Sequence, residues 1–154
     1  EIPLRLVGSE MCIRDSDNPE NVDLWFGRGR IFYALKNYDE SIASFKKVVE
    51  LKPDLFEGNY YLGVFYTIKA DEMNKVMNEK QYSSQTAYDT DLKEVNAVYM
   101  DAVPWFEKAY ELKKDDVNTL DFLKSICFRL RDEEGMMDKY NKYNTLLKEA
   151  KGEE

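Results

Sequence analysis

The sequence predicts an all-α protein, an α-α superhelix (solenoid) of three helix–turn–helix repeats, the middle one with lengthened helices. Three observations lead to this prediction. From Val22 onwards, apolar side chains recur at three- and four-residue steps, which is the spacing of one face of an α-helix. Aromatic residues are abundant (11 Tyr, 8 Phe, 2 Trp) and Gly (7) and Pro (4) are scarce, which suits packed helices. The helical pattern is then restated twice, as in helical-repeat proteins.

The composition argues against several classes of function. The 154 residues are a one-domain length, and 22 Lys+Arg against 30 Asp+Glu give a net charge of −8. An acidic chain is a poor partner for nucleic acid or an anionic membrane, because both require a basic surface. The chain has no His, which removes the usual general base and the commonest metal ligand. No apolar run approaches the roughly 18 residues of a membrane span. We therefore expect no cofactor, no metal and no membrane insertion.

The two cysteines, Cys12 and Cys127, are far apart and have no CxxC spacing. A disulfide framework or a zinc site is therefore not expected. Cys127 lies among Ile126, Phe128 and Leu130, which predicts a buried structural thiol.

The first sixteen residues differ from the rest, because they have no helical period. The run LVGSEMCIRDS resembles a translated sequencing-adapter sequence, so we expect residues 1–18 to be a non-native or disordered segment. The alternative is an ordinary N-terminal arm. The single domain should then span residues 19–150, with Asn18 as the first N-cap and Pro19 at the first helical position.

Residues 22–55 predict a hairpin of two helices. Asn37 marks the end of the first helix and Pro53 the end of the second. Such a hairpin cannot bury both of its faces alone, so neighbouring hairpins are expected. Its apolar positions are Val22, Trp25, Phe26, Gly29, Phe32 and Tyr33 in the first helix, and Tyr38, Ile42, Phe45, Val48 and Val49 in the second.

The second repeat, residues 56–116, contains an insertion. The step from Phe32 to Ser41 is 9 residues, whereas the matching step from Tyr66 to Ala102 is 36, which leaves 27 extra residues. Apolar residues continue through the insertion at steps of three and four, as in a coiled-coil seam. We interpret it as two lengthened helices that form an antiparallel arm, projecting by roughly 20 Å with a turn near residues 81–86. A disordered loop is the alternative. Pro104 should kink the returning helix.

Residues 117–150 form the third repeat, with a turn at residues 131–135 and a last helix from about Met136 to Ala150. Residues 151–154 should fray. A terminal repeat is expected to be atypical, because its outer face meets solvent.

The signature positions resemble the tetratricopeptide repeat (TPR) family. In the first repeat they are Trp25, Gly29, Phe32, Tyr38, Phe45 and Pro53; in the second they include Leu62, Gly63, Tyr66, Ala102, Phe106 and Ala109. Arg28, Lys36 and Lys124 depart from the Leu, Gly and small residue that are usual in the family. The overall pattern is similar to TPR proteins of Bacteroidetes-type bacteria. A signal peptide could precede the natural start, so the bacterial cytoplasm and the periplasm both remain open.

The resemblance implies a non-catalytic scaffold for protein–protein interaction. In TPR proteins the first helices of successive repeats line a concave groove, which holds an extended peptide or a partner helix. The alternative is that Phe26, Tyr60 and Phe128 merely complete the core. By position, the groove residues here are Asp23, Phe26, Arg30, Tyr33, Glu57, Tyr60, Val64, Thr67, Asn118, Asp121, Ser125 and Phe128.

A different function would use the arm. An apolar seam along Tyr88, Leu92, Val95 and Tyr99 would suit a structural subunit that self-associates into a homo-oligomer. Catalysis is not expected. The adjacent acids Asp115-Asp116 and Glu133-Glu134 lie at helix boundaries, where acids near a helix N-terminus stabilise the helix.

Overall fold

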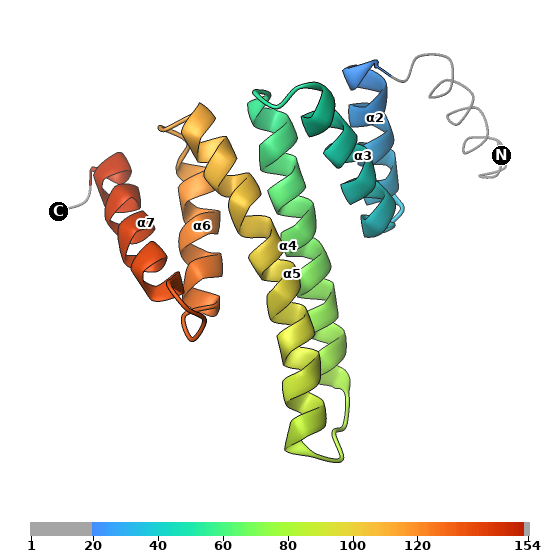
Figure 1. The fold of residues 1–154 in the computed structure, drawn as a ribbon, viewed down its shortest axis with the longest axis vertical. Helices are drawn as coiled ribbons and strands as arrows, with labels where there is room; N and C mark the ends of the chain where they lie inside the picture. Colours follow the sequence, from blue (N-terminus) through green and yellow to red (C-terminus); the bar gives the residue numbers. More distant parts are fainter. Residues whose placement is uncertain (1–19, 153–154) are drawn as a thin grey trace, which may run out of the picture.

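The computed structural model describes residues 20–152. This part of the chain forms six helices and no strand, with each helix packing against its neighbours in sequence (Figure 1). The predicted all-α superhelix is confirmed. Residues 1–19, with the suspected foreign segment, Asn18 and Pro19, lie outside the described residues. The helices are α2 (Val22–Ala34), α3 (Tyr38–Leu51), α4 (Phe56–Glu79), α5 (Gln85–Leu112), α6 (Val117–Arg129) and α7 (Met136–Lys151).

The first helix described begins at Val22, and the predicted N-cap Asn18 lies outside the described residues. Asn21 is the N-cap of α2, because its side-chain oxygen accepts from the amides of Asp23 (3.0 Å) and Leu24 (3.3 Å). These are two of the amides that the first turn of a helix leaves without a partner. Asn37 ends the first hairpin turn as predicted and caps α3, accepting from the amide of Glu40 (3.4 Å).

Glycine lets the two helices of a repeat approach each other. A Cβ at Gly29 would overlap the ring of Phe45, and one at Gly63 would come within 2.9 Å of the ring of Phe106. These are equivalent positions in the first two repeats, so each helix pair closes on a Phe ring. The third repeat has Lys124 in place of the glycine, and there the second helix instead packs Tyr140 against Phe128 of α6, with ring centroids 5.1 Å apart.

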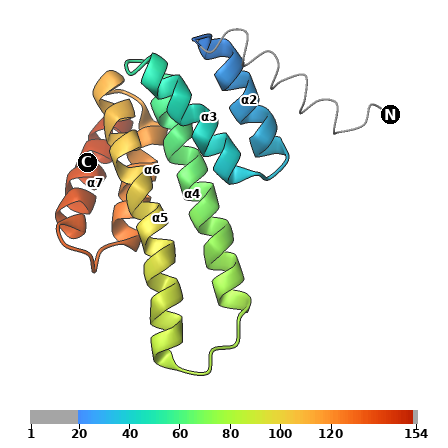
Figure 2. The ribbon, with the colours of Figure 1, turned by 45° about the vertical axis from the view of Figure 1, so that its right-hand side comes forward.

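The insertion is helical. At 24 and 28 residues, α4 and α5 are the longest helices described, and they project as an antiparallel arm beyond the ends of the others (Figures 1 and 2). The predicted lengthened helices are therefore confirmed. The turn between them covers residues 80–84. Helix α5 continues through Pro104 to Leu112.

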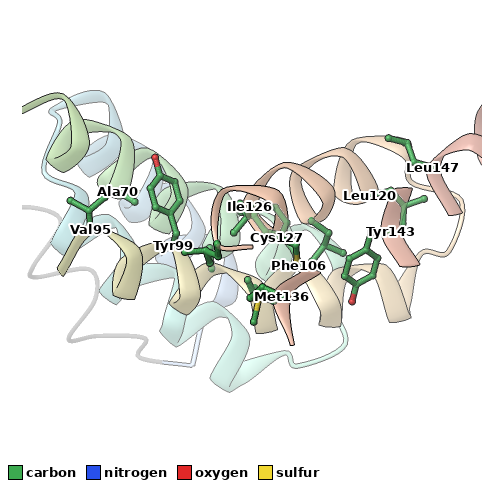
Figure 3. Close-up of a cluster of buried hydrophobic side chains, with 14 of the residues drawn as sticks. Ala70, Val95, Tyr99, Phe106, Leu120, Ile126, Cys127, Met136, Tyr143 and Leu147 are labelled. Carbon is green, nitrogen blue, oxygen red and sulfur yellow. The ribbon is translucent and has the colours of Figure 1, made fainter. Parts of the chain in front are cut away.

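The described core consists of two clusters. The larger runs from the base of the arm through α6 to α7, and includes Tyr99, Phe106, Cys127 and Tyr143 (Figure 3). Cys127 is buried, as predicted, and burial raises the pKa of its thiol to about 11. The thiol therefore stays protonated and packs as a small apolar group. The smaller cluster joins α3 to the upper part of α4 and consists of Ile42, Phe45, Val48, Leu62 and Phe65.

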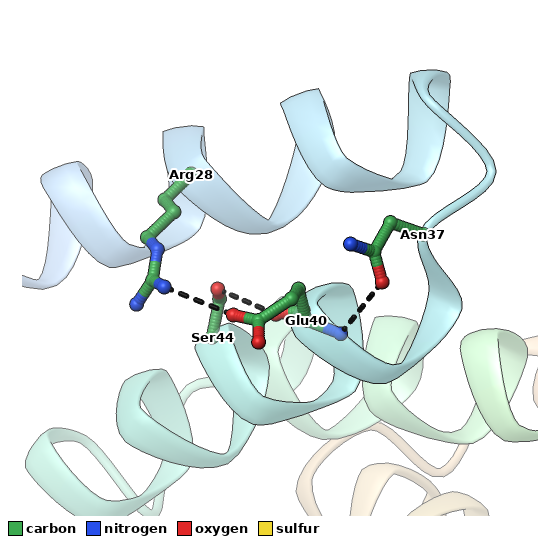
Figure 4. A network of polar contacts seen from close by, with 4 residues as sticks. All are labelled: Arg28, Asn37, Glu40 and Ser44. Atoms are coloured by element: carbon green, nitrogen blue, oxygen red, sulfur yellow. Dashed lines mark hydrogen bonds and ion pairs between the residues drawn. The ribbon is translucent and has the colours of Figure 1, made fainter. Parts of the chain in front are cut away.

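Arg28 takes the place of the Leu that is usual in the family, and it ties α2 to α3. Its guanidinium lies 3.0 Å from the Glu40 carboxylate (Figure 4). It also lies over the rings of Trp25 (5.1 Å) and Phe32 (5.2 Å). Ser44 donates to the backbone carbonyl of Glu40 (2.7 Å). Arg28 therefore shields part of the apolar surface of α2 from water.

Candidate functional site

The first helices of the three repeats carry two neighbouring depressions. The first depression lies between α2 and α4, and the second lies between α4, α5 and α6. They lie next to each other on α4, where Val64 lines the first and Thr67, one turn further on, lines the second. Eight of the twelve groove residues that the sequence suggested line one or the other: Phe26, Arg30, Tyr33 and Val64 in the first, and Thr67, Asn118, Asp121 and Ser125 in the second.

The first depression, of about 470 Å³, is aromatic. Tyr33 packs on Phe65 with ring centroids 5.1 Å apart, and Phe26 meets Tyr61 edge-on at 5.7 Å. Tyr33 and Tyr61 are 42% and 38% exposed, so each offers a ring face or edge to solvent. Arg30 stands exposed at the depression and forms no ion pair with the described residues. This depression can therefore accept an apolar or aromatic group and an adjacent negative charge.

The second depression, of about 440 Å³, is more polar. Asp71 of α4 and Asp121 of α6 face it from opposite sides, and both are exposed. Asn118 and Ser125 add neutral hydrogen-bonding groups, and Phe122 contributes an apolar wall. Such a surface favours a hydrogen-bonding or positively charged group.

A partly buried polar cluster forms the wall of the second depression. Tyr99 donates a hydrogen bond to Asp71, and the guanidinium of Arg129 lies 4.4 Å above the Tyr99 ring. Arg129 also donates to the side-chain oxygen of Asn74 (2.7 Å). Burial, and then the hydrogen bond to Asp71, raise the pKa of Tyr99, so its hydroxyl remains a donor. The cluster fixes the position of Asp71 and joins α6 to the arm.

The sequence did not point to this cluster as a unit. Asn74 and Arg129 are 55 residues apart, and neither belongs to a recognisable motif. Helix α5 packs against both α4 and α6 and so brings these two residues within reach of each other, and the insertion was the only sequence signal near this contact.

Four suggested groove residues lie elsewhere. Asp23 and Glu57 are exposed acids in the first turns of α2 and α4, where they favour helix formation. Tyr60 packs on the rings of Phe106 (5.9 Å) and Phe122 (6.1 Å), which matches the core alternative. Burial, followed by the charge of Asp116, raises the pKa of Tyr60. Phe128 lies against α7 and lines neither depression.

The arm seam faces inwards. Val95 and Tyr99 are buried against α4, and Tyr88 and Leu92 pack on the same cluster. The seam therefore holds the two helices of the arm together, and its role in self-association stays a prediction.

None of the helices between residues 20 and 152 combines the length and apolar character of a membrane span.

Asp116, one of the acids at helix boundaries, is the N-cap of α6 and accepts hydrogen bonds from the amide (2.8 Å) and hydroxyl (2.6 Å) of Thr119. Its carboxylate is thus engaged in a structural role.

Comparison with known proteins gives one family match. Residues 29–67, from the middle of α2 to the middle of α4, match the model of the TPR repeat. The crystal structure of MamA aligns with a TM-score of 0.37 and 19% sequence identity, covering 92% of this chain and 85% of that chain. The crystal structure of PilW, described as a widely conserved type IV pilus biogenesis factor, aligns with a TM-score of 0.36 and 15% identity, covering 96% and 70%. No curated protein matches. The family match places a TPR repeat at residues 29–67, within the helical-repeat fold described above.

Proposed function

We propose that this protein is a non-catalytic scaffold that binds an extended peptide segment of a partner protein across α2, α4 and α6. TPR repeats are protein-interaction modules, and proteins built from them are generally scaffolds rather than enzymes. The proposal adds where the partner lies and what chemistry it presents.

The observation that carries the proposal is that two chemically different depressions lie one helical turn apart on α4. Val64 and Thr67 are about 4.5 Å apart along the helix axis, whereas an extended chain advances about 3.3 Å per residue. A short extended segment therefore spans both depressions. Its apolar or aromatic side chain would fill the first depression, with an acidic group near Arg30. A polar or basic side chain would lie near Asp71 and Asp121 in the second.

A peptide library displayed on phage and panned against the purified protein tests this proposal. Ser125 is an exposed small residue of the second depression, so Ser125→Trp should fill the depression without disturbing the core. Ala43 is an exposed small residue of α3 that lines neither depression, and Ala43→Trp is the matched control.

We expect selected peptides to bind Ser125→Trp at least about tenfold more weakly. The introduced Trp ring fills the second depression, and the few side chains that enter such pockets contribute most of the binding free energy. Binding to Ala43→Trp should be unchanged, and Tyr33→Ala should weaken peptides that carry an aromatic anchor. Selected peptides that bind all three variants equally well would place the binding site elsewhere and contradict the proposal.

A further inference from the structure

The arm carries a third depression, which we call the arm groove, on the side where α3 begins. Its volume is about 320 Å³, and it shares no lining residue with the two depressions described above. Its floor is apolar, because Met73, Val76 and Met77 of α4 and Val95 of α5 form it. Val76 is 54% exposed, although it is a large apolar residue. Exposed Val76 and half-buried Met73 thus offer an apolar strip to solvent, with the buried side chains of Met77 and Val95 beneath it.

The position of the arm groove explains why no helix covers it. Tyr38, the first residue of α3, lines its upper end, and Asp39 pairs there with Lys69 of α4 (2.6 Å). Helix α4 continues ten residues beyond Lys69 to Glu79, which is a further length of about 15 Å. Figures 1 and 2 show α2 and α3 ending well before the turn of the arm. The arm groove therefore continues the surface of α4 on which α3 packs, over a length of about three helical turns.

The charges around the arm groove are not balanced. Its two cations are engaged: Lys69 pairs with Asp39, and Lys80 pairs with Asp91 (2.6 Å). The lining carboxylates Glu72 and Glu94 are exposed and have no ion pair with the described residues. The free charge at the rim is therefore negative on both helices of the arm. An occupant with basic side chains beside its apolar face would complement this arrangement.

We infer that the arm groove binds an amphipathic helix of a partner protein, about three turns long and in line with α3. Its apolar face lies on Met73 and Val76, and its Lys or Arg side chains flank that face and meet Glu72 and Glu94. Binding of an amphipathic helix in an apolar groove is a recurrent mode of recognition, and methionines adapt well to the shape of such a helix. The arm thus gives the protein a second binding surface, separate from the peptide site on α2, α4 and α6.

Synthetic helical peptides test this inference with the full chain. The probe is a labelled peptide of about 14 residues with Leu at helical i, i+3, i+4 and i+7 positions and Lys on both flanks. The comparison peptide has the same apolar face and Glu in place of every Lys. Fluorescence anisotropy measures the affinity of each, and circular dichroism checks that every protein variant is folded.

We expect the basic peptide to bind, and Val76→Asp to weaken it by at least about tenfold because a charge enters the apolar floor. The double variant Glu72→Lys with Glu94→Lys should reverse the preference in favour of the acidic peptide. Glu133→Lys with Glu134→Lys, at exposed positions in the turn before α7, makes the same change in net charge far from the arm groove and should leave the preference unchanged.

Three results would overturn the inference. The first is the absence of binding, or equal binding of both peptides. The second is an equal effect of the two charge-reversal variants, which would show a general attraction to an acidic protein. The third is a dimer in light scattering that Val76→Asp dissociates, since the occupant would then be a second copy. Ser125→Trp should not affect binding of the basic peptide, so failure here and failure of the peptide site are distinguishable.

Discussion

Lys36 has a backbone conformation that favours glycine. Its φ is 57°, and the TPR pattern usually has Gly at this position, between the two helices of a repeat. Replacing Lys36 with Gly removes a Cβ that is strained in the left-handed region, so we expect Lys36→Gly to stabilise the protein by about 1 kcal/mol. Urea denaturation measures this. Lys36→Ala keeps the Cβ and should give no such gain; equal stabilities of the two variants would show that the turn is not strained.

Two glycines of α2 lie two residues apart and should respond to substitution in opposite directions. A Cβ at Gly29 would overlap the Phe45 ring, whereas a Cβ at Gly27 would have no neighbouring atom within 4 Å. Gly29→Ala should therefore cost about 1–3 kcal/mol through overpacking. Gly27→Ala should stabilise α2 by up to about 1 kcal/mol, because Ala is the better helix former. Thermal unfolding of both variants checks this, and destabilisation of similar size in both would rule out the helix crossing as the reason for Gly29.

Glu107 makes the stability depend on pH. Its carboxylate accepts from the hydroxyl of Tyr143 (2.6 Å) and pairs with Lys139 (2.9 Å). Burial alone would raise the pKa of Glu107, but these two contacts outweigh it and hold the pKa below its usual 4.5. The stability that Glu107 contributes is therefore present above that value, and it is lost as the pH falls through the lower pKa of the folded state.

Glu107→Gln should lower the free energy of unfolding at neutral pH by about 1–2 kcal/mol, because hydrogen bonds to a charged acceptor are replaced by weaker ones. The difference from the wild type should then shrink as the pH falls below about 4.5. Urea titrations at several pH values measure both effects. Glu133→Gln, at an exposed position, is the control; a difference for Glu107→Gln that stays constant with pH would contradict the linkage.

At the scale of the element, the arm shows what periodicity can and cannot reveal. Steps of three and four residues through Leu92, Val95 and Tyr99 predicted a helix with one apolar face, and α5 has that face. Periodicity does not say which neighbour covers the face, and the seam proved to be the contact between α4 and α5. The surface that remains open lies around Val76, beyond the start of α3 at Tyr38. Only the relative lengths of the folded helices reveal it.

The tip of the arm should be its least stable part. The buried side chains thin out from Ala70 and Tyr99 towards the turn, where the first residues of α5 are exposed. Ser84 caps α5 by accepting from the amide of Ala87 (3.2 Å). Ser84→Ala should therefore speed hydrogen exchange in the first turn of α5, at a local cost of about 1 kcal/mol, with little change in the global midpoint. Ser83→Ala removes a neighbouring hydroxyl that caps no helix; equal exchange in both variants would argue against the cap.

At the scale of the whole molecule, the repeat pattern predicted most of the fold, and eight of the twelve suggested groove residues line the two depressions. The signature positions fixed the helix pairs because close packing at Gly29 and Gly63 leaves few residue types that fit. The same positional logic brought Arg30 and Asp121 to the two depressions. It failed for Phe128, because the last repeat lacks the glycine and packs that ring on α7. Asp71 and Arg129 join the site through contacts between distant segments, for which a single sequence carries no signal.

The two core clusters predict that the protein does not unfold uniformly. The larger cluster has fifteen buried residues across α4 to α7 and the smaller has five, among the described residues. In a repeat protein each unit is stabilised mainly by its neighbours, so α2 and α3 should lose protection from hydrogen exchange at a lower urea concentration than α5 and α6. Phe45→Leu, within the smaller cluster, should lower the urea concentration of only the first step, in which α2 and α3 lose protection. Leu123→Ala should lower the urea concentration of the second step, in which α5 and α6 lose protection.

Hydrogen exchange with mass spectrometry resolves the two steps, and equal shifts of all helices in both variants would establish a single cooperative unit instead. The difference has a functional consequence, because the aromatic depression lies between α2 and α4, on the less stable part. A peptide bound there should raise the protection of α2 and α3 by the free energy of binding to the folded form. A helix bound in the arm groove should instead protect the lower part of α4, so the two binding surfaces give separate exchange signatures.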